Sequence, residues 1–377
     1  MNNKSIHIIY TCLFFALTST IRAQTIQSLD SVEHTVFLIG DAGEPKSKTS
    51  EVFDLLLKQV KPVETKSTIV FLGDNIYPGG MPSENETGRE SAEKIISYQL
   101  NQLKKSRATT YYIPGNHDWN RGKKNGLSHL LNEENIIEKK LDKGDSFIPS
   151  NGCPGPVQIN VTHNLVLIAI DTQWWLHQHE KPPLKRSDCK EASTADVIKN
   201  LKKILAKNKN KNIIVVGHHP LMSRGDHGGY YSLKNHIFPL TNFYKNLFIP
   251  LPIIGSIYPF YRSTIGNIQD LAHPKYKYMI RQLNEVFNGY DNLVYAAGHE
   301  HNLEYFFKNN QHFIVSGSGS KTSYAKKMKL PNFTSERKGF FKLSYMKNGS
   351  VHMETYGIVD GIGKLLFQKV IIQPKES

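Results

Sequence analysis

Short apolar runs recur along the chain, and each ends in glycine or in a group of polar residues. Runs that are apolar at nearly every position and rich in β-branched residues are typical of strands buried on both faces. Six segments have this pattern: 35–43, 68–75, 109–118, 165–173, 212–220 and 292–301. The pattern therefore predicts six buried strands with polar side chains at their carboxyl ends.

Amphipathic segments of helical length lie between these runs. They are residues 49–60, 88–106, 126–141, 193–208 and 274–289. Strands that alternate with helices predict an α/β fold, and such folds place their chemistry at the carboxyl ends of the strands. We therefore expect the polar strand ends to form the functional site.

The last quarter of the chain has a different pattern. Hydrophobic and polar residues alternate with period two over 304–309, 312–317, 339–357 and 364–373. The sequence Lys-Asn-Gly-Ser at 347–350 predicts a hairpin turn. These segments predict antiparallel strands that belong to the same domain, because the preceding segment contains candidate site residues.

Segment 235–273 fits neither pattern. Its part from 246 to 261, NLFIPLPIIGSIYPFY, is apolar and aromatic, and Pro250, Pro252 and Pro259 exclude one continuous helix. The stretch is also too short to span a bilayer. Three interpretations remain: a lid, a surface for a membrane or a protein partner, or a locally packed loop.

Residues 1–23 have the layout of a cleaved signal peptide: Lys4, an apolar stretch to Leu17, and small residues near Ala23. An uncleaved anchor is the alternative. We expect a secreted or periplasmic protein with one domain over 30–375. Its remaining cysteines, Cys153 and Cys189, form either a disulfide or two free thiols.

The chain is basic, with a formal net charge of +14. Its lysines are dispersed, and they are not interleaved with aromatic residues as in single-strand binding surfaces. We therefore expect no nucleic-acid partner. The charge favours anionic substrates or surfaces.

The polar strand ends contain metal-binding residue types. They are Asp41, Asp74, Tyr77, Asn116, His117, Asp118, His218, His299 and His301. Each alone has a structural explanation, such as a helix cap, a turn or a buried histidine. Together, two carboxylates, a phenol, an amide and three imidazoles exceed the needs of one ion. They predict two ions that share a bridging ligand.

The motifs GDAG, GDNIY, GNHD, GHHP and GHEH occur in this order from Gly40 to His301. Their residues and order resemble the calcineurin-like metallophosphoesterase superfamily. The tyrosine of GDNIY makes the chain similar to the purple acid phosphatases of the small, tartrate-resistant type. The resemblance implies a four-layer α/β/β/α sandwich of two mixed sheets with flanking helices.

The resemblance also implies a role for each candidate. Ligands of a ferric ion would be Asp41, Tyr77 and His301. Ligands of a divalent ion, Fe, Zn or Mn, would be Asn116, His218 and His299. Asp74 would bridge the two ions.

Further residues would act outside the metal ligands. His117 and His227 would contact phosphate and assist the leaving group, with Asp118 orienting His117. His219 departs from the family pattern, and we expect it to contact substrate or compete for metal.

These roles imply a phosphomonoesterase, similar to acid phosphatases, that attacks a small phosphate ester or a phosphoprotein with a metal-bound hydroxide. One alternative keeps the metals but hydrolyses other bonds, as a phosphodiesterase, nucleotide pyrophosphatase or phosphoprotein phosphatase. The other is a secreted binding module without catalysis.

Overall fold

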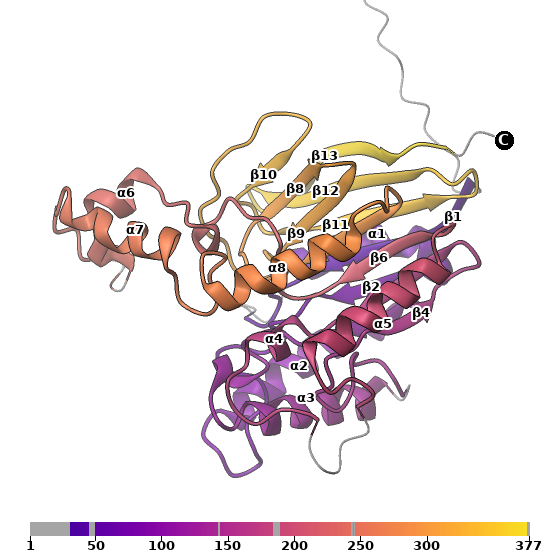
Figure 1. The fold of residues 1–377 in the computed structure, drawn as a ribbon, viewed down its shortest axis with the longest axis horizontal. Coiled ribbons are helices and arrows are strands. Elements are labelled where there is room, and N and C mark those ends of the chain that lie inside the picture. The colour runs from indigo at the N-terminus through magenta and orange to yellow at the C-terminus, as the bar shows by residue number, and fades with distance from the viewer. Residues whose placement is uncertain are drawn as a thin grey trace, which may run out of the picture.

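The computed structural model describes residues 31–44, 50–141, 144–183, 189–242, 244 and 246–374. The signal peptide expected at 1–23 lies outside these residues. The described chain forms two mixed β-sheets with helices on their outer faces (Figure 1). This arrangement confirms the α/β fold class.

The first sheet has the strand order β13-β12-β11-β1-β2-β3. Its parallel strands are β1 (Val32–Ile39), β2 (Ser67–Phe71) and β3 (Thr109–Tyr112). The antiparallel strands are β11 (Gly339–Met346), β12 (Val351–Val359) and β13 (Ile362–Ile372). The turn predicted at 347–350 joins β11 to β12, so the last quarter of the chain completes this sheet.

The second sheet has the strand order β10-β8-β9-β7-β6-β5-β4. Its parallel strands are β5 (Leu165–Ala169), β6 (Asn212–Val216), β7 (Leu293–Ala297) and β9 (Gln311–Ser316). The antiparallel strands are β4 (Val157–Asn160), β8 (Leu303–Lys308) and β10 (Phe333–Ser335). The pattern had not indicated β4 or β10, which are short and only partly buried.

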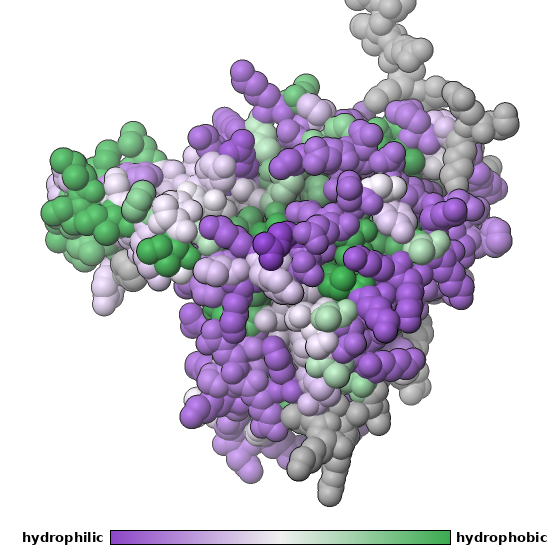
Figure 2. All heavy atoms as spheres, in the orientation of Figure 1, coloured by the Kyte–Doolittle hydropathy of each residue, from purple (hydrophilic) through white to green (hydrophobic). Residues whose placement is uncertain are grey.

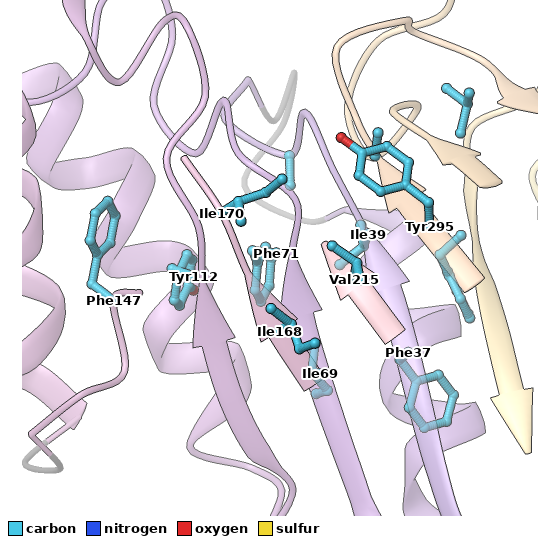
Figure 3. Close-up of a cluster of buried hydrophobic side chains, with 14 of the residues drawn as sticks. Phe37, Ile39, Ile69, Phe71, Tyr112, Phe147, Ile168, Ile170, Val215 and Tyr295 are labelled. Atoms are coloured by element: carbon cyan, nitrogen blue, oxygen red, sulfur yellow. The ribbon is translucent and has the colours of Figure 1, made fainter. Parts of the chain in front are cut away.

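The central strands are buried on both faces, as the apolar runs predicted. In β1, Val36 and Leu38 belong to a core that contains residues of both sheets and no helix. Phe37 and Ile39 belong to the core that lies under the helices (Figure 3). Because successive side chains of a strand point to opposite faces, a strand between two cores must be apolar at every position.

The five predicted helices are present with slightly different ends. They are α1 (Glu51–Val60), α2 (Arg89–Leu103), α3 (Gly126–Leu141), α5 (Thr194–Lys207) and α8 (Pro274–Phe287). The strand predicted to extend to residue 173 ends at Ala169 instead. Asp171 accepts a hydrogen bond from the Trp174 N–H at 2.9 Å and caps α4 (Thr172–Leu176).

Segment 235–273 contains short helical elements that contact one another. Together with α6 (Leu233–Ile237) it forms two 3₁₀ turns (Pro239–Asn242 and Ile254–Ser256) and α7 (Ile257–Thr264). These elements project from the body of the molecule and carry apolar residues at their surface (Figures 1 and 2). We call residues 233–265 the arm.

Helix α7 accommodates Pro259 because this residue lies in its first turn, where the missing N–H has no partner in the helix.

Among the described residues, no helix combines the length and the apolar character that a membrane crossing requires.

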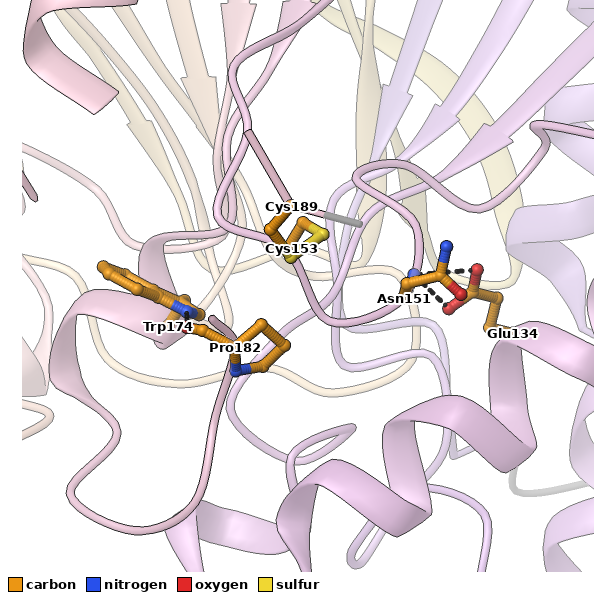
Figure 4. The surroundings of a disulfide bond; sticks show 6 residues. All are labelled: Glu134, Asn151, Cys153, Trp174, Pro182 and Cys189. Carbon is orange, nitrogen blue, oxygen red and sulfur yellow. Dashed lines mark hydrogen bonds between the residues drawn. A yellow bond between two sulfur atoms is a disulfide. The ribbon is translucent and has the colours of Figure 1, made fainter. Parts of the chain in front are cut away.

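Cys153 and Cys189 form a disulfide, with their Cα atoms 5.4 Å apart (Figure 4). The loop beside Cys153 is held to α3, because the Asn151 N–H donates to both carboxylate oxygens of Glu134 at 2.9 and 2.8 Å. The Trp174 indole donates to the Pro182 carbonyl at 2.5 Å. The disulfide therefore joins two surface loops that are already fixed to helices.

Removing the disulfide should destabilise the protein. The bond links residues 36 positions apart, and closing a loop of this length in the unfolded chain contributes about 3–4 kcal/mol. We expect the Cys153→Ser/Cys189→Ser variant to lose this amount in urea denaturation. Wild-type protein in reductant is the control and should match the variant, whereas equal midpoints for variant and oxidised wild type would contradict the estimate.

Candidate metal centre

The ends of five strands from both sheets meet at one place. The segments after β1, β2 and β3 supply Asp41, Asp74 and Asn116, and those after β6 and β7 supply His218 and His299. Backbone hydrogen bonds continue past the strand ends, from Leu72 N–H to the Ile39 carbonyl at 2.9 Å and from Gly298 N–H to the His218 carbonyl at 3.0 Å. The candidate ligands are therefore mounted on a rigid frame.

Glycine next to the ligands allows the two sheets to approach closely. A Cβ on Gly73 would lie 2.7 Å from Nδ1 of His218, and this residue has a φ of +87°. A Cβ on Gly298 would lie 2.6 Å from Oδ2 of Asp41. A larger residue at either position would separate the carboxylates from the imidazoles.

Three candidate ligands have a left-handed backbone conformation. The φ angles are 55° for Asp41, 53° for Asp74 and 71° for His299. This region is unfavourable for residues with a Cβ, and it is concentrated at functional sites. The unfavourable backbone conformation occurs at the residues that direct carboxylate and imidazole groups toward one another.

One set of donor atoms surrounds the phenol of Tyr77. Its oxygen lies 2.9 Å from Oδ1 of Asp41, 3.0 Å from Oδ2 of Asp74 and 3.1 Å from Nε2 of His301. Burial, followed by the negative charges of Asp41 and Asp74, raises the pKa of Tyr77 well above its ordinary value. Only a strongly charged cation would stabilise a tyrosinate here.

A second set of donor atoms surrounds the side-chain oxygen of Asn116. Oδ1 of Asn116 lies 2.9 Å from Nε2 of His218 and 3.0 Å from Nδ1 of His299. Asp74 contacts both sets, since its Oδ1 lies 3.4 Å from Nε2 of His218 while its Oδ2 contacts Tyr77. The structure thus brings together all seven residues that we expected to bind metal.

The hydrogen bonds behind the imidazoles determine which nitrogen faces the site. Nδ1 of His218 lies 2.8 Å from the Leu72 carbonyl, and Nε2 of His299 lies 2.9 Å from the Gln269 carbonyl. A carbonyl only accepts, so each of these nitrogens carries the proton and donates it. In the neutral rings, the opposite nitrogens present lone pairs, as metal-binding histidines do.

The lone pair of His299 faces the oxygen of Asn116, which is itself an acceptor. Burial, and then the charge of His227, lowers the pKa of His299 well below its ordinary value, so this ring stays neutral. Acceptors placed opposite one another at 3.0 Å need a cation between them. Asp41, Asp74 and His218 also offer ligand atoms within 4.8 Å of one another. The donor set therefore fits metal ions.

Asp74 stays ionised although it is buried. Burial alone would raise the pKa of this carboxyl, but the nearby His218 and His117 side chains and a 2.8 Å hydrogen bond from the His117 N–H hold it below its ordinary value. An ionised carboxylate with one oxygen toward each donor set has the arrangement of a bridging ligand.

His117 and His227 lie at the edge of the site and are partly exposed, at 21% and 26% of the side chain. Nδ1 of His117 donates to the Pro78 carbonyl at 2.7 Å, and Nε2 lies 3.9 Å from Asp74. Nδ1 of His227 lies 2.8 Å from Asp270, and its ring lies 4.1 Å from that of His299. Both imidazoles are held through Nδ1, so Nε2 is the nitrogen available to a substrate.

Asp118 does not orient His117, contrary to the expectation from the sequence. Its carboxylate accepts hydrogen bonds from the Asn75 N–H at 2.9 Å, the Gly115 N–H at 2.7 Å and the Asn75 side chain. Asp118 is fully buried. It therefore ties the loop after β2 to the loop after β3, while the Pro78 carbonyl orients His117.

His219 has no free nitrogen with which to contact a substrate or a metal ion. It is fully buried, with Nδ1 2.8 Å from the Thr172 hydroxyl and Nε2 2.7 Å from Gln269 Oε1. Both nitrogens are thus used in protein hydrogen bonds. The predicted substrate contact is wrong, and His219 supports the ring of His299, which lies 4.6 Å away.

Sequence reasoning missed the acid that holds His227. Asp270 accepts from His227 with Oδ1 and from the Nε of Arg262, on α7, with Oδ2 at 2.5 Å. Burial opposes ionisation, but the hydrogen bonds from His227 and Arg262 lower the pKa of Asp270. No motif marked this aspartate, which lies 43 positions after its histidine.

Two further residues support the site. Glu300 accepts from the Ser223 hydroxyl at 2.7 Å and from the Gly228 N–H at 3.0 Å, and so holds the loop of His227. Its position between the two histidines of GHEH could have marked Glu300 as a residue of the site. Lys321 lies 3.4 Å above the ring of Tyr77 and 2.5 Å from Glu44, which places a cation beside the donors.

Comparisons with known proteins agree with this geometry. The model of the calcineurin-like phosphoesterase family matches residues 34–303. No curated protein sequence matches the chain. GAP50, described as the anchor in the inner membrane complex of Plasmodium, has a similar fold, with a TM-score of 0.56, 18% identity, and coverage of 92% of this chain and 90% of that chain.

A lower TM-score of 0.32 relates the chain to Vps29 of Entamoeba histolytica complexed with zinc, at 12% identity and with coverage of 89% of this chain and 99% of that chain. The family match extends from β1 to the start of β8 and includes every candidate ligand. The chain therefore belongs to the calcineurin-like phosphoesterase family.

Proposed function

We propose that this chain is a phosphomonoesterase of the purple acid phosphatase type, with Fe(III) and a divalent ion in one centre. The observation that supports it best is the pair of donor sets that share Asp74. One set has the anionic oxygens of Asp41 and Tyr77, which suit a hard trivalent ion. The other has an amide and two imidazoles, which suit Fe(II), Zn or Mn.

When bound, such a pair of cations polarises a phosphoryl oxygen and makes a water molecule acidic. The protein would add a proton donor. His227 lies at the edge of the donor sets, and Asp270 fixes its Nδ1, so Nε2 can protonate the leaving alkoxide. His117, fixed by the Pro78 carbonyl, lies beside the ring of Tyr77 and would contact the phosphate.

We also propose that the protein is exported to the cell exterior or the periplasm. The disulfide between Cys153 and Cys189 supports this location, because disulfides persist in oxidising compartments. A small phosphorylated molecule or a phosphoprotein would be the substrate, drawn by the net positive charge of the chain.

A non-catalytic binding protein is the second candidate. GAP50, which shares the fold, is described as an anchor. The two partly exposed histidines favour an enzyme, because a binding module needs no oriented proton donor at its metal site. Turnover of phosphate esters distinguishes the two candidates.

Loss of one ligand should abolish hydrolysis. We expect His299→Ala to lower kcat/KM for p-nitrophenyl phosphate by about 10³-fold or more, since the ions stabilise the charge that develops on phosphate. The exposed His163→Ala is the matched control and should keep wild-type activity. The same measurement with a diester should give a lower rate than with the monoester. Full activity of the His299 variant would contradict the assignment.

The phenol should determine the colour and the metal preference. Tyr77→Phe removes only the phenolic oxygen, so the iron-loaded variant should lose the visible absorption of a tyrosinate complex and shift its preference toward divalent ions. Metal analysis and an absorption spectrum of protein purified without chelator check this. An unchanged coloured spectrum would show that Tyr77 is not a ligand.

Asp270 should act as a positioning residue for His227. Asp270→Asn should lower kcat by about 10–100-fold with KM unchanged, because the imidazole of His227 loses the carboxylate that orients it. Asp270→Glu is the conservative comparison: it keeps a carboxylate beside His227 and should restore part of the lost kcat. An equal loss of kcat in both variants, or a large change of KM, would indicate a structural effect only.

A further inference from the structure

The arm concentrates the exposed apolar side chains of this protein. Of the seventeen large hydrophobic residues that are exposed in the described part of the chain, eleven lie within 233–265. The most exposed are Ile253 at 87%, Leu233 at 74% and Tyr244 at 70%. Figure 2 shows an apolar patch over the end of the arm, at the left of the view, which we call the apolar cap. Contiguous patches of this kind mark an interaction surface.

The charge of the arm is of one sign. No aspartate or glutamate occurs between Asp226 and Asp270, whereas this stretch contains Lys234 and Lys245. Arg262 also lies here, but it is buried and paired with Asp270. The ammonium of Lys234 lies 4.8 Å from the ring of Phe248, at the border of the apolar cap. Apolar residues fringed by lysine, without any acid, are typical of segments that bind anionic lipid surfaces.

Aromatic residues form part of the cap. Tyr244 is 70% exposed, Phe248 54% and Tyr261 43%. Tyrosine favours the boundary between lipid head groups and acyl chains, where its ring is buried and its hydroxyl stays hydrated. The composition of the cap therefore matches a membrane interface.

The arm holds its apolar residues outward in a defined conformation. The Leu251 N–H donates to the Ile237 carbonyl at 2.8 Å, and Nδ1 of His236 lies 3.0 Å from the Ser256 hydroxyl. Ile253 has a φ of 73° and a ψ of −63°, an unfavourable conformation for a β-branched residue. The strained turn directs the side chain of Ile253 to the surface. Transfer of this side chain from water into an apolar phase would be favourable.

A second copy of the chain is a poorer occupant than a membrane. Two arms would bring together two basic fringes with no acid on either, in molecules that each have a formal net charge of +14. A bilayer with anionic head groups supplies both an apolar phase and the missing negative charge. We propose that the arm inserts its apolar cap into the interface of anionic phospholipid membranes.

Vesicle co-sedimentation of the full chain tests this proposal. Vesicles of phosphatidylcholine with phosphatidylglycerol should bind the protein at least about tenfold more strongly than phosphatidylcholine alone, and added salt should weaken the binding. The variant Ile254→Asp/Phe260→Asp should lose binding at least about tenfold, because two apolar side chains no longer leave water.

A matched control lies on β13. Ile362 is 61% exposed, as is Ile254, and Leu365 is 45% exposed. Ile362→Asp/Leu365→Asp should bind vesicles as the wild type does. The thermal unfolding of both variants should match that of the wild type, which excludes a folding defect.

Three results would overturn the proposal: no binding of the wild type to anionic vesicles, equal loss of binding in the control, or binding that the arm substitutions leave unchanged. Sedimentation velocity without lipid distinguishes membrane binding from self-association. Self-association that the arm variant abolishes, in the absence of vesicle binding, would assign the cap to a second copy of the chain instead.

Discussion

The site depends on the burial of an ionised carboxylate among imidazoles at the junction of two sheets. Asp74 is 1% exposed, and each of its oxygens faces a different set of donors. A buried charge is costly unless opposite charges and hydrogen bonds compensate it. The close glycines, the left-handed backbone at the ligands and the carbonyl partners of the histidines all serve to place compensating groups around this one carboxylate.

Much of the fold could be predicted from the sequence because burial on both faces leaves a clear pattern. The strands before Asp41, Asp74 and His218 end in the apolar runs VFLI, IVF and IIVV, so the polar residue after each marks the sheet edge. The strand predicted through residue 173 was too long, since a capping aspartate begins a helix within the same apolar run. Periodicity cannot separate these two outcomes in so short a segment.

Contacts between distant residues were harder to predict. A sequence gives the type of a residue but not the partners of its polar atoms. His219 had the same signal as its neighbour His218, yet its two nitrogens bond to Thr172 and Gln269, which lie far away in the chain. No sequence motif marked Asp270, because its partner His227 precedes the arm in the sequence whereas Asp270 follows it. The arm itself has prolines that remove any regular period.

The loop of His227 is held from outside the arm. Glu300 fixes it through Ser223 and Gly228, and Asp270 fixes the imidazole itself. Neither acid belongs to 233–265, but Arg262 of α7 does, and it donates to Asp270 at 2.5 Å and lies 3.1 Å from Nδ1 of His227. Insertions between α6 and α7 can therefore be tolerated as long as Arg262 keeps its place, which makes this part of the protrusion a natural site for diversification and for engineered fusions, whereas deletion of α7 would remove a partner of Asp270.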